Sequence, residues 1–378
     1  MTSPVFFLSL LGLMLVDSLN GQVPSEIKLL PNAEFARKLD DKPVQLYVLR
    51  NENGMTAEIT NYGARVVSLW VPDRAGRFGD VVLGFGSLQA YLDAKDPYFG
   101  AVIGRYANRI GEAELPVADT TYALRANDGL HQLHGGAQGF HTVVWEADQI
   151  DEQTLDLRYV SPHLQEGYPG ELTVRVRYHL SNENALKIEY EATVDRPTVV
   201  NLTHHSFFNL RGEGNGTIND HLLQINAAYF TPVGEGLIPT GQIATVEGTP
   251  FDFRQPMPIG RRLRTPHPQL TFGNGYDHNF VLNQTLDGLN YAAKVIEPIS
   301  GRVMEVLTNE PGLQFYGGNF LDGTVVGKTG KTYDFRGAFC LESQHFPDSP
   351  HHPHFPSTVL QPGEGYYSVC IYRFSTVR

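Results

Sequence analysis

The sequence predicts an all-β protein, a large antiparallel β-sandwich with few short helices. Apolar and polar residues alternate with a period of two through much of the chain, as expected for strands that bury one face. Glycine (38 residues) and proline (24 residues) are plentiful, which suits a fold with many turns. No amphipathic segment of helical period reaches about 15 residues, and no parallel βαβ rhythm is present. These observations favour a large antiparallel sandwich or barrel over an α/β fold.

The individual elements follow from the same alternation. Residues 55–72 (MTAEITNYGARVVSLWVP) and 154–160 (TLDLRYV) predict strands, and residues 87–94 (SLQAYLDA) predict a short helix. Residues 171–194 predict a hairpin around the polar turn SNEN. Its first strand places on one face Val174, Val176, Tyr178 and Leu180. Its second strand places on one face Leu186, Ile188, Tyr190, Ala192 and Val194.

Composition and charge exclude several classes of partner. The chain has 378 residues, of which 41% are hydrophobic, so a large core is expected. A net charge of −12 disfavours nucleic acid, whose phosphates need a basic surface. No run of lysine or arginine suggests an anionic membrane. We expect a ligand that is neutral or is held by hydrogen bonds.

The N-terminal region predicts export. Residues 5–16 (VFFLSLLGLMLV) form an apolar run of signal-peptide length, too short to span a membrane. Gly21 offers a cleavage point, although no lysine or arginine precedes the run. We therefore expect a signal peptide over residues 1–21 and one domain over residues 22–378. The mature protein would be periplasmic or extracellular, with no membrane attachment.

The chain contains only two cysteines, Cys340 and Cys370. In an exported protein these two could form a disulfide. A fold of this size needs no covalent cross-link, because its hydrophobic core is large enough. We therefore expect two buried free thiols in neighbouring strands.

Two adjacent histidines in the segment NLTHHSFFNL (residues 201–210) cannot both face one cleft if the segment is a strand. The apolar residues Leu202, Phe208 and Leu210 share the face of His204. The face of His205 carries a polar row with one aromatic residue, namely Asn201, Thr203, Phe207 and Asn209. His205 is therefore the better candidate for catalysis, unless the polar row merely faces solvent.

Metal and nucleophilic chemistry find little support. The C-terminal histidines His345, His351, His352 and His354 lack zinc-type spacing, and three intervening prolines impose an extended path. There is no G-x-S-x-G motif and no phosphate-binding glycine loop. We therefore expect no metal and no other cofactor. General acid/base catalysis remains, with Glu342, Asp277 and one of the paired histidines as candidates.

Taken in order, several motifs resemble the aldose 1-epimerase (galactose mutarotase) family, over nearly all of the chain after residue 21. The motifs are EITNYGARVVSLWVPDRAGRFGDVVLGF, DPYFGAVIGRYANRI, LHGGAQGFHTVVW, NLTHHSFFNL, TPFDFR, GYDHNFVL, EPGLQFYGGNFLDG and FCLESQHFPDSPHHPHFPSTVLQPGEGYYS. The resemblance implies the galactose mutarotase-like supersandwich, a monomer or homodimer, and interconversion of the α and β anomers of free aldohexoses such as galactose and glucose.

The resemblance also implies roles for single residues. His205 would be the general acid and Glu342 the general base. The implied substrate-binding residues are Asn108, Arg109, His134, Ser206, Phe207, Asp277 and Gln314. His204 stands where the family commonly has asparagine, and Phe207 where it usually has tyrosine, so one hydroxyl contact to the sugar is in doubt. Arg109 would stabilise negative charge on oxygen or support the cleft through an ion pair.

Ordinary pKa values of about 6.5 for histidine and about 4.3 for glutamate suit the implied chemistry near neutral pH. Glu342 would then be a carboxylate and His205 an imidazolium. Three alternatives stay open. Asp277 and Glu342 could be the carboxylate pair of a glycosidase. The fold could serve as a non-catalytic carbohydrate-binding module. An epimerase for phosphorylated sugars would need more basic residues than Arg105 and Arg109.

Overall fold

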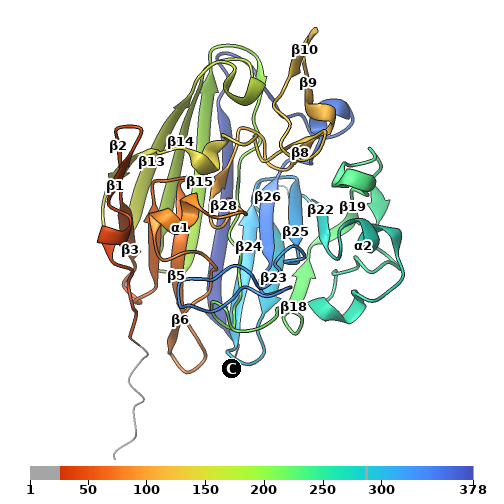
Figure 1. Ribbon diagram of the computed structural model, residues 1–378. Helices are drawn as coiled ribbons and strands as arrows, with labels where there is room; N and C mark the ends of the chain where they lie inside the picture. Colours follow the sequence, from red (N-terminus) through yellow and green to blue (C-terminus); the bar gives the residue numbers. More distant parts are fainter. Residues whose placement is uncertain (1–25, 286–287, 378) are drawn as a thin grey trace, which may run out of the picture.

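The computed structural model describes residues 26–285 and 288–377. The predicted signal peptide lies outside these residues. The described chain is mostly antiparallel strands (Figure 1), and its α-helices are the short α1 (Leu88–Leu92) and α2 (Pro268–Phe272). No helix in the described ranges has the length and apolarity needed to cross a membrane. The predicted all-β class is confirmed.

The largest sheet has nine strands, and the strand nearest the C-terminus lies at its centre. In spatial order the strands are β12 (Glu146–Gln149), β13 (Thr154–Ser161), β14 (Leu172–Leu180), β15 (Ala185–Val194), β28 (Tyr366–Thr376), β24 (Arg302–Thr308), β23 (Asn290–Ile296), β18 (Leu222–Ile225) and β21 (Met257–Pro258). The predicted hairpin is β14 and β15, with Val176 opposite Tyr190. The apolar residues predicted for one face of each strand are buried.

Two smaller sheets complete the layers. The five-stranded sheet contains β20 (Ala244–Thr245), β19 (Ala227–Phe230), β22 (Asp277–Leu282), β25 (Gly312–Tyr316) and β26 (Cys340–Gln344). The four-stranded sheet contains β3 (Leu46–Arg50), β4 (Thr56–Thr60), β5 (Arg65–Pro72) and β6 (Phe78–Asp80). Residues 55–72 thus form two paired strands, separated by a turn.

Five short two-stranded ladders complete the pairing of the described strands. They pair β1 (Arg37–Leu39) with β2 (Lys42–Val44), β7 (Val102–Ile103) with β17 (Thr203–His204), β8 (Arg109–Ile110) with β11 (Gln132–Leu133), β9 (Glu114–Val117) with β10 (Thr120–Ala123), and β16 (Thr198–Val199) with β27 (Val359–Leu360).

One hydrophobic core joins the three larger sheets. Residues such as Ile59, Val176 and Leu313, one from each sheet, belong to the same buried cluster. A buried tyrosine adds a hydrogen bond between two of these sheets. The Tyr372 hydroxyl of β28 donates to the carbonyl of Leu341 in β26 at 2.9 Å. The nine-stranded sheet therefore packs against and supports the strand that carries Glu342.

The helix and cysteine predictions have clear outcomes. The helix predicted over residues 87–94 is α1, where the Ser87 side chain caps the N-terminus by accepting from the backbone N–H of Ala90. Cys340 and Cys370 are buried and free, as expected. They do not lie in neighbouring strands, however, because Cys340 is in β26 of the five-stranded sheet and Cys370 in β28 of the nine-stranded sheet.

Candidate active site

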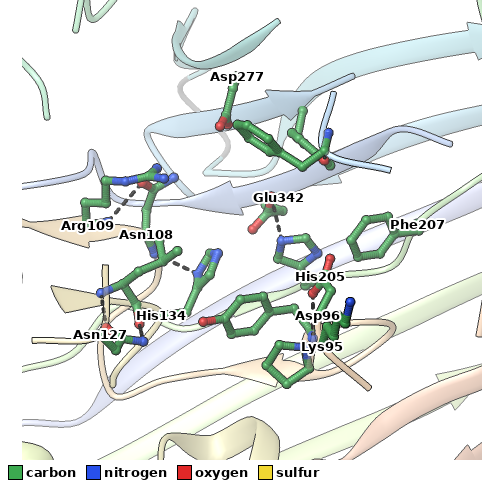
Figure 2. A pocket seen from close by; sticks show the side chains of 15 residues that line it. Lys95, Asp96, Asn108, Arg109, Asn127, His134, His205, Phe207, Asp277 and Glu342 are labelled. Atoms are coloured by element: carbon green, nitrogen blue, oxygen red, sulfur yellow. Dashed lines mark hydrogen bonds and ion pairs between the residues drawn. The ribbon is translucent and has the colours of Figure 1, made fainter. Parts of the chain in front are cut away.

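A pocket of about 400 Å³ opens where β8, β22 and β26 meet the loop after α1 (Figure 2). Asn108, Arg109 and His134 line one side of it, while His205 and Phe207 line the other, with Glu342 between the two sides. The full lining is Lys95, Asp96, Pro97, Tyr98, Asn108, Arg109, Asn127, Leu133, His134, His205, Phe207, Asp277, Tyr316, Phe320 and Glu342.

The β8–β11 ladder places Arg109 and His134 side by side. Leu133 pairs with Arg109, and the backbone N–H of His134 donates to the carbonyl of Asn108 at 3.0 Å. Asn108 and His134 both have left-handed backbones, at φ 66° and 53°. Gly135 follows at φ 80°, where a Cβ would lie 2.0 Å from the carbonyl oxygen of Gly104, so only glycine fits.

A backbone hydrogen bond defines the proton position on His134. The N–H of Asn108 donates to His134 Nδ1 at 3.1 Å, so Nδ1 carries no proton. The neutral ring must then hold its proton on Nε2. Burial and the nearby charges of His205 and Arg109 lower the pKa of His134 well below its ordinary value, which keeps the ring neutral. His134 is therefore a hydrogen-bond donor toward the pocket.

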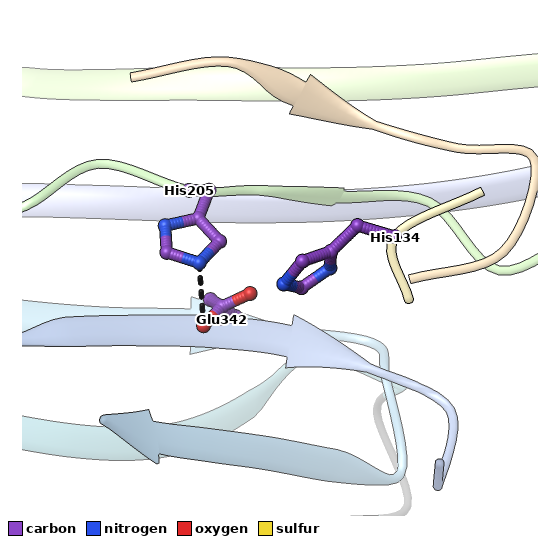
Figure 3. A group of neighbouring side chains, drawn as sticks. All are labelled: His134, His205 and Glu342. Atoms are coloured by element: carbon purple, nitrogen blue, oxygen red, sulfur yellow. Dashed lines mark ion pairs between the residues drawn. The ribbon is translucent and has the colours of Figure 1, made fainter. Parts of the chain in front are cut away.

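His205 and Glu342 face each other across the pocket floor (Figure 3). Nε2 of His205 lies 3.6 Å from Oε1 of Glu342, which is longer than a good hydrogen bond. The Oε2 atom of Glu342 is buried and has no hydrogen-bond partner among the residues that the structure describes. Buried polar atoms are normally partnered. The carboxylate of Glu342 is thus placed to accept a hydrogen bond from a hydroxyl group in the pocket.

Burial gives both members of this pair unusual pKa values. It lowers the pKa of His205 to about 4, opposed in part by a hydrogen bond to the residue's own backbone. Burial, with the nearby charges of Asp277 and Asp96, raises the pKa of Glu342 well above its ordinary value, while Arg109 acts in the opposite direction. The expectation of ordinary pKa values is therefore wrong for this pair. Both shifts favour the neutral forms, so the proton that the pair shares is drawn toward Glu342.

The two adjacent histidines have opposite environments, although only Thr203–His204 (β17) of the predicted strand is hydrogen-bonded as a strand. The His204 ring lies 5.9 Å from Tyr178 and 6.2 Å from Tyr372, on the side of the main core. The His205 ring lies in the pocket, 5.8 Å from the stacked ring of Tyr98 and 5.1 Å from His134. The polar row on the His205 side is buried and does not face solvent.

We expect His204→Asn to change activity by less than about threefold, because His204 is absent from the pocket lining. Both ring nitrogens of His204 are buried without hydrogen-bond partners among the described residues, and burial lowers its pKa to about 3. Initial rates at saturating sugar would measure this. A loss comparable to that of a His205 substitution would show that the two histidines have been assigned the wrong way round.

The structure also places the other predicted binding residues. The Nε2 group of Gln314 donates to Oδ1 of Asp277 at 2.7 Å, so Gln314 lies behind Asp277 and does not line the pocket. Ser206 is buried and likewise absent from the lining. Phe207 stacks on Phe99 at 4.3 Å and gives the pocket an apolar wall.

The position of Arg109 suits both of the roles left open by the sequence. Its Nε lies 2.8 Å from Oδ2 of Asp128, a partly exposed carboxylate, and this ion pair supports the rim. The guanidinium also lines the pocket and influences the pKa of Glu342. An ion pair on one edge leaves other N–H groups of a guanidinium free to donate.

No sequence pattern predicts several of the lining residues, notably Asp96, Tyr98, Asn127, Tyr316 and Phe320. Asp96 and Tyr98 stand in the motif DPYFG, for which we predicted no site residue. Burial raises the pKa of Asp96 to about 6. Asn127 and Leu133 exchange two hydrogen bonds, at 2.7 and 3.0 Å, which closes the loop beside His134. Loop residues of this kind lack a sequence period that could place them.

The donor atoms of His134, His205 and Glu342 lie within 4.8 Å of one another, which is close enough to consider a metal ion. His134 does not fit that role. Its Nδ1 already accepts the Asn108 N–H, so Nε2 bears the proton and has no free lone pair for a metal. The C-terminal histidines are used elsewhere, since His345 pairs with Glu310 and His351 with Asp348, both at 2.6 Å.

Comparisons with known proteins agree with this geometry. The family model described as aldose 1-epimerase matches residues 45–373. The chain is 45% identical to galactose mutarotase of Bos taurus over 332 residues, covering 88% of this chain and 94% of that one. It is 39% identical to aldose 1-epimerase of Escherichia coli over 338 residues, covering 89% and 96%. An aldose epimerase homologue from C. elegans superposes with a TM-score of 0.82 at 30% identity, covering 89% of this chain and all of the other. The chain therefore belongs to the aldose 1-epimerase family.

Proposed function

We propose that the protein interconverts the α and β anomers of free aldohexoses, galactose and glucose among them. The observation that carries this proposal is the buried pair of His205 and Glu342, which face each other at 3.6 Å across a pocket lined with hydrogen-bonding groups. The relatives named galactose mutarotase and aldose 1-epimerase support the same activity. An acid and a base are both needed for this reaction, whereas a binding module needs neither.

The reaction uses one proton on each side of the anomeric centre. The Glu342 carboxylate takes the proton of the C1 hydroxyl, C1=O forms, and the C1–O5 bond breaks with its electron pair going to O5. The imidazolium of His205 gives its Nε2 proton to O5. Rotation about C1–C2 presents the other face of the aldehyde, and the reverse steps close the ring. Each group ends as it began.

The reaction needs the pair's proton on His205 and a charged Glu342. Burial alone favours the neutral form of both groups, so the bound sugar has to shift this balance. Sugar hydroxyls that donate to Glu342 favour its charged form. Arg109 favours the same form, and it also stabilises negative charge on oxygen as the ring opens. His134, whose Nε2 carries a proton, is a second donor to the sugar.

The shared proton predicts a specific pH dependence of kcat/KM, which reports the free enzyme. Only the form with one proton on the pair is active. As pH falls toward about 4, the pair gains a second proton, on His205. Neither group can then act as a base, so activity falls. As pH rises through the elevated pKa of Glu342, no acid remains and activity falls again. We expect the acid limb nearer to pH 4 than to 6.5, in rates measured where circular dichroism shows a folded protein. A limb near 6.5 would contradict the assignment to a buried His205.

Polarimetry tests the activity directly. Freshly dissolved α-D-galactose and α-D-glucose are followed with and without the purified protein, and we expect both rotations to relax faster with it. The ratio of the two rates gives the sugar preference. Calorimetric binding of sugar without acceleration would instead indicate a carbohydrate-binding module.

We propose further that the mature chain starts near residue 22 and is exported as a single domain. The apolar run of residues 5–16 supports this proposal. N-terminal sequencing of secreted or periplasmic material would test it. Light scattering on the same sample would distinguish a monomer from a homodimer.

A further inference from the structure

Two side chains of strand β26, Cys340 and Glu342, lie beside the two ring nitrogens of His205. Side chains two residues apart on a strand share one face and are separated by about 7 Å, so Cys340 and Glu342 project together toward His205. Oε1 of Glu342 lies 3.6 Å from Nε2, and Sγ of Cys340 lies 3.6 Å from Nδ1. A distance of 3.6 Å is normal for a contact to the larger sulfur atom. Glu342 has a proposed role in the reaction, and Cys340 has none so far.

The proposed reaction requires a proton on Nδ1. When the imidazolium gives its Nε2 proton to O5, the neutral ring that remains must keep its other proton on Nδ1. A buried N–H without an acceptor costs free energy. Sγ of Cys340 lies beside Nδ1 and is placed to accept this N–H. The Cys340 thiol itself stays protonated, because burial and the carboxylates of Glu342, Asp96 and Asp277 raise its pKa well above the ordinary value.

We propose that Cys340 is a positioning residue for the general acid, whose sulfur accepts the Nδ1–H of His205 and so reserves Nε2 for proton exchange with the sugar. This inference rests on the role proposed for His205. Sulfur is a weak acceptor. A carboxylate at this point would stabilise the imidazolium and make it a poorer acid. A weak acceptor orients the ring but stabilises the imidazolium less than a carboxylate would, so the imidazolium still releases its Nε2 proton readily.

Cys370 supplies a matched control. It is also buried and free, but it lies in β28, where its thiol interacts with the side chains of Ser343 and Tyr372, whereas Cys340 contacts His205. We expect Cys340→Ala to lower kcat by about 10- to 100-fold with KM changed less than twofold, since the buried Nδ1–H is left without its acceptor and the ring loses its orientation. Cys340→Ser, which keeps an acceptor, should recover most of that loss. Cys370→Ala should leave kcat unchanged.

The proposal is overturned if Cys340→Ala and Cys370→Ala have the same kcat, which would reduce Cys340 to packing. Nitrogen NMR of ¹⁵N-histidine-labelled wild type keeps the test decisive even if Cys340→Ala does not fold. The expected result is a neutral His205 ring with its proton on Nδ1, assigned by comparison with His205→Asn. A proton on Nε2 instead would overturn the proposal. Failure of the wild type to accelerate mutarotation would refute the proposed activity, a separate outcome from either of these.

Discussion

Replacing Glu342 by glutamine should lower kcat by at least about 10³-fold, since general bases contribute on the order of 10²–10⁴-fold and this one also shares a proton with His205. The amide has the shape of the carboxyl group but cannot take the proton from the C1 hydroxyl. Polarimetric initial rates with galactose would measure the loss against the uncatalysed relaxation of the sugar.

The fold should survive Glu342→Gln. Burial raises the pKa of Glu342 and so favours a neutral group at this position. A neutral amide of the same shape suits these surroundings. We expect circular dichroism to match the wild type and sugar binding to persist in calorimetry. Full activity in a folded, sugar-binding Glu342→Gln protein would exclude Glu342 as the base.

Replacing His205 by asparagine should have the second-largest effect, a loss of about 10²–10³-fold in kcat. Asparagine can hydrogen-bond a sugar oxygen but cannot protonate O5. Polarimetry at high enzyme concentration would measure the residual rate. His204→Asn is the matched control, because it makes the same substitution one residue away on the core side.

The double variant Glu342→Gln/His205→Asn tests whether the two groups act as one unit. Residues that share one proton should lose activity together, so the second substitution should add little to the first. Losses that multiply would show two independent contributions. That result would contradict a shared proton while leaving both residues in the site.

The regular parts of the fold were predictable because they depend on local periodicity. The hairpin of β14 and β15 follows from strict alternation, and its predicted faces are the buried ones. The segment of residues 201–210 was less predictable, since only β17 pairs as a strand and its neighbours form isolated bridges. The faces of His204 and His205 still followed the alternation, because the chain stays extended between two packed layers.

Two features of the site lay beyond the sequence because they arise from packing between distant segments. The pKa values of His205 and Glu342 depend on burial and on the charges of Asp277, Asp96 and Arg109, which several elements bring together. The position of Gln314 behind Asp277 likewise depends on the register of β22 against β25, where Asn279 pairs with Gln314. No local pattern reports such pairings across strands.

The proposed mechanism rests on one claim, that Glu342 and His205 exchange protons with a bound sugar. The most direct measurement is the α–β exchange rate of galactose at equilibrium, followed by NMR magnetisation transfer with wild type and Glu342→Gln at equal, calorimetrically verified occupancy. Rapid exchange with the wild type and only the uncatalysed rate with the variant is the predicted result. Equal exchange rates for the two proteins, whether fast or slow, would contradict the claim.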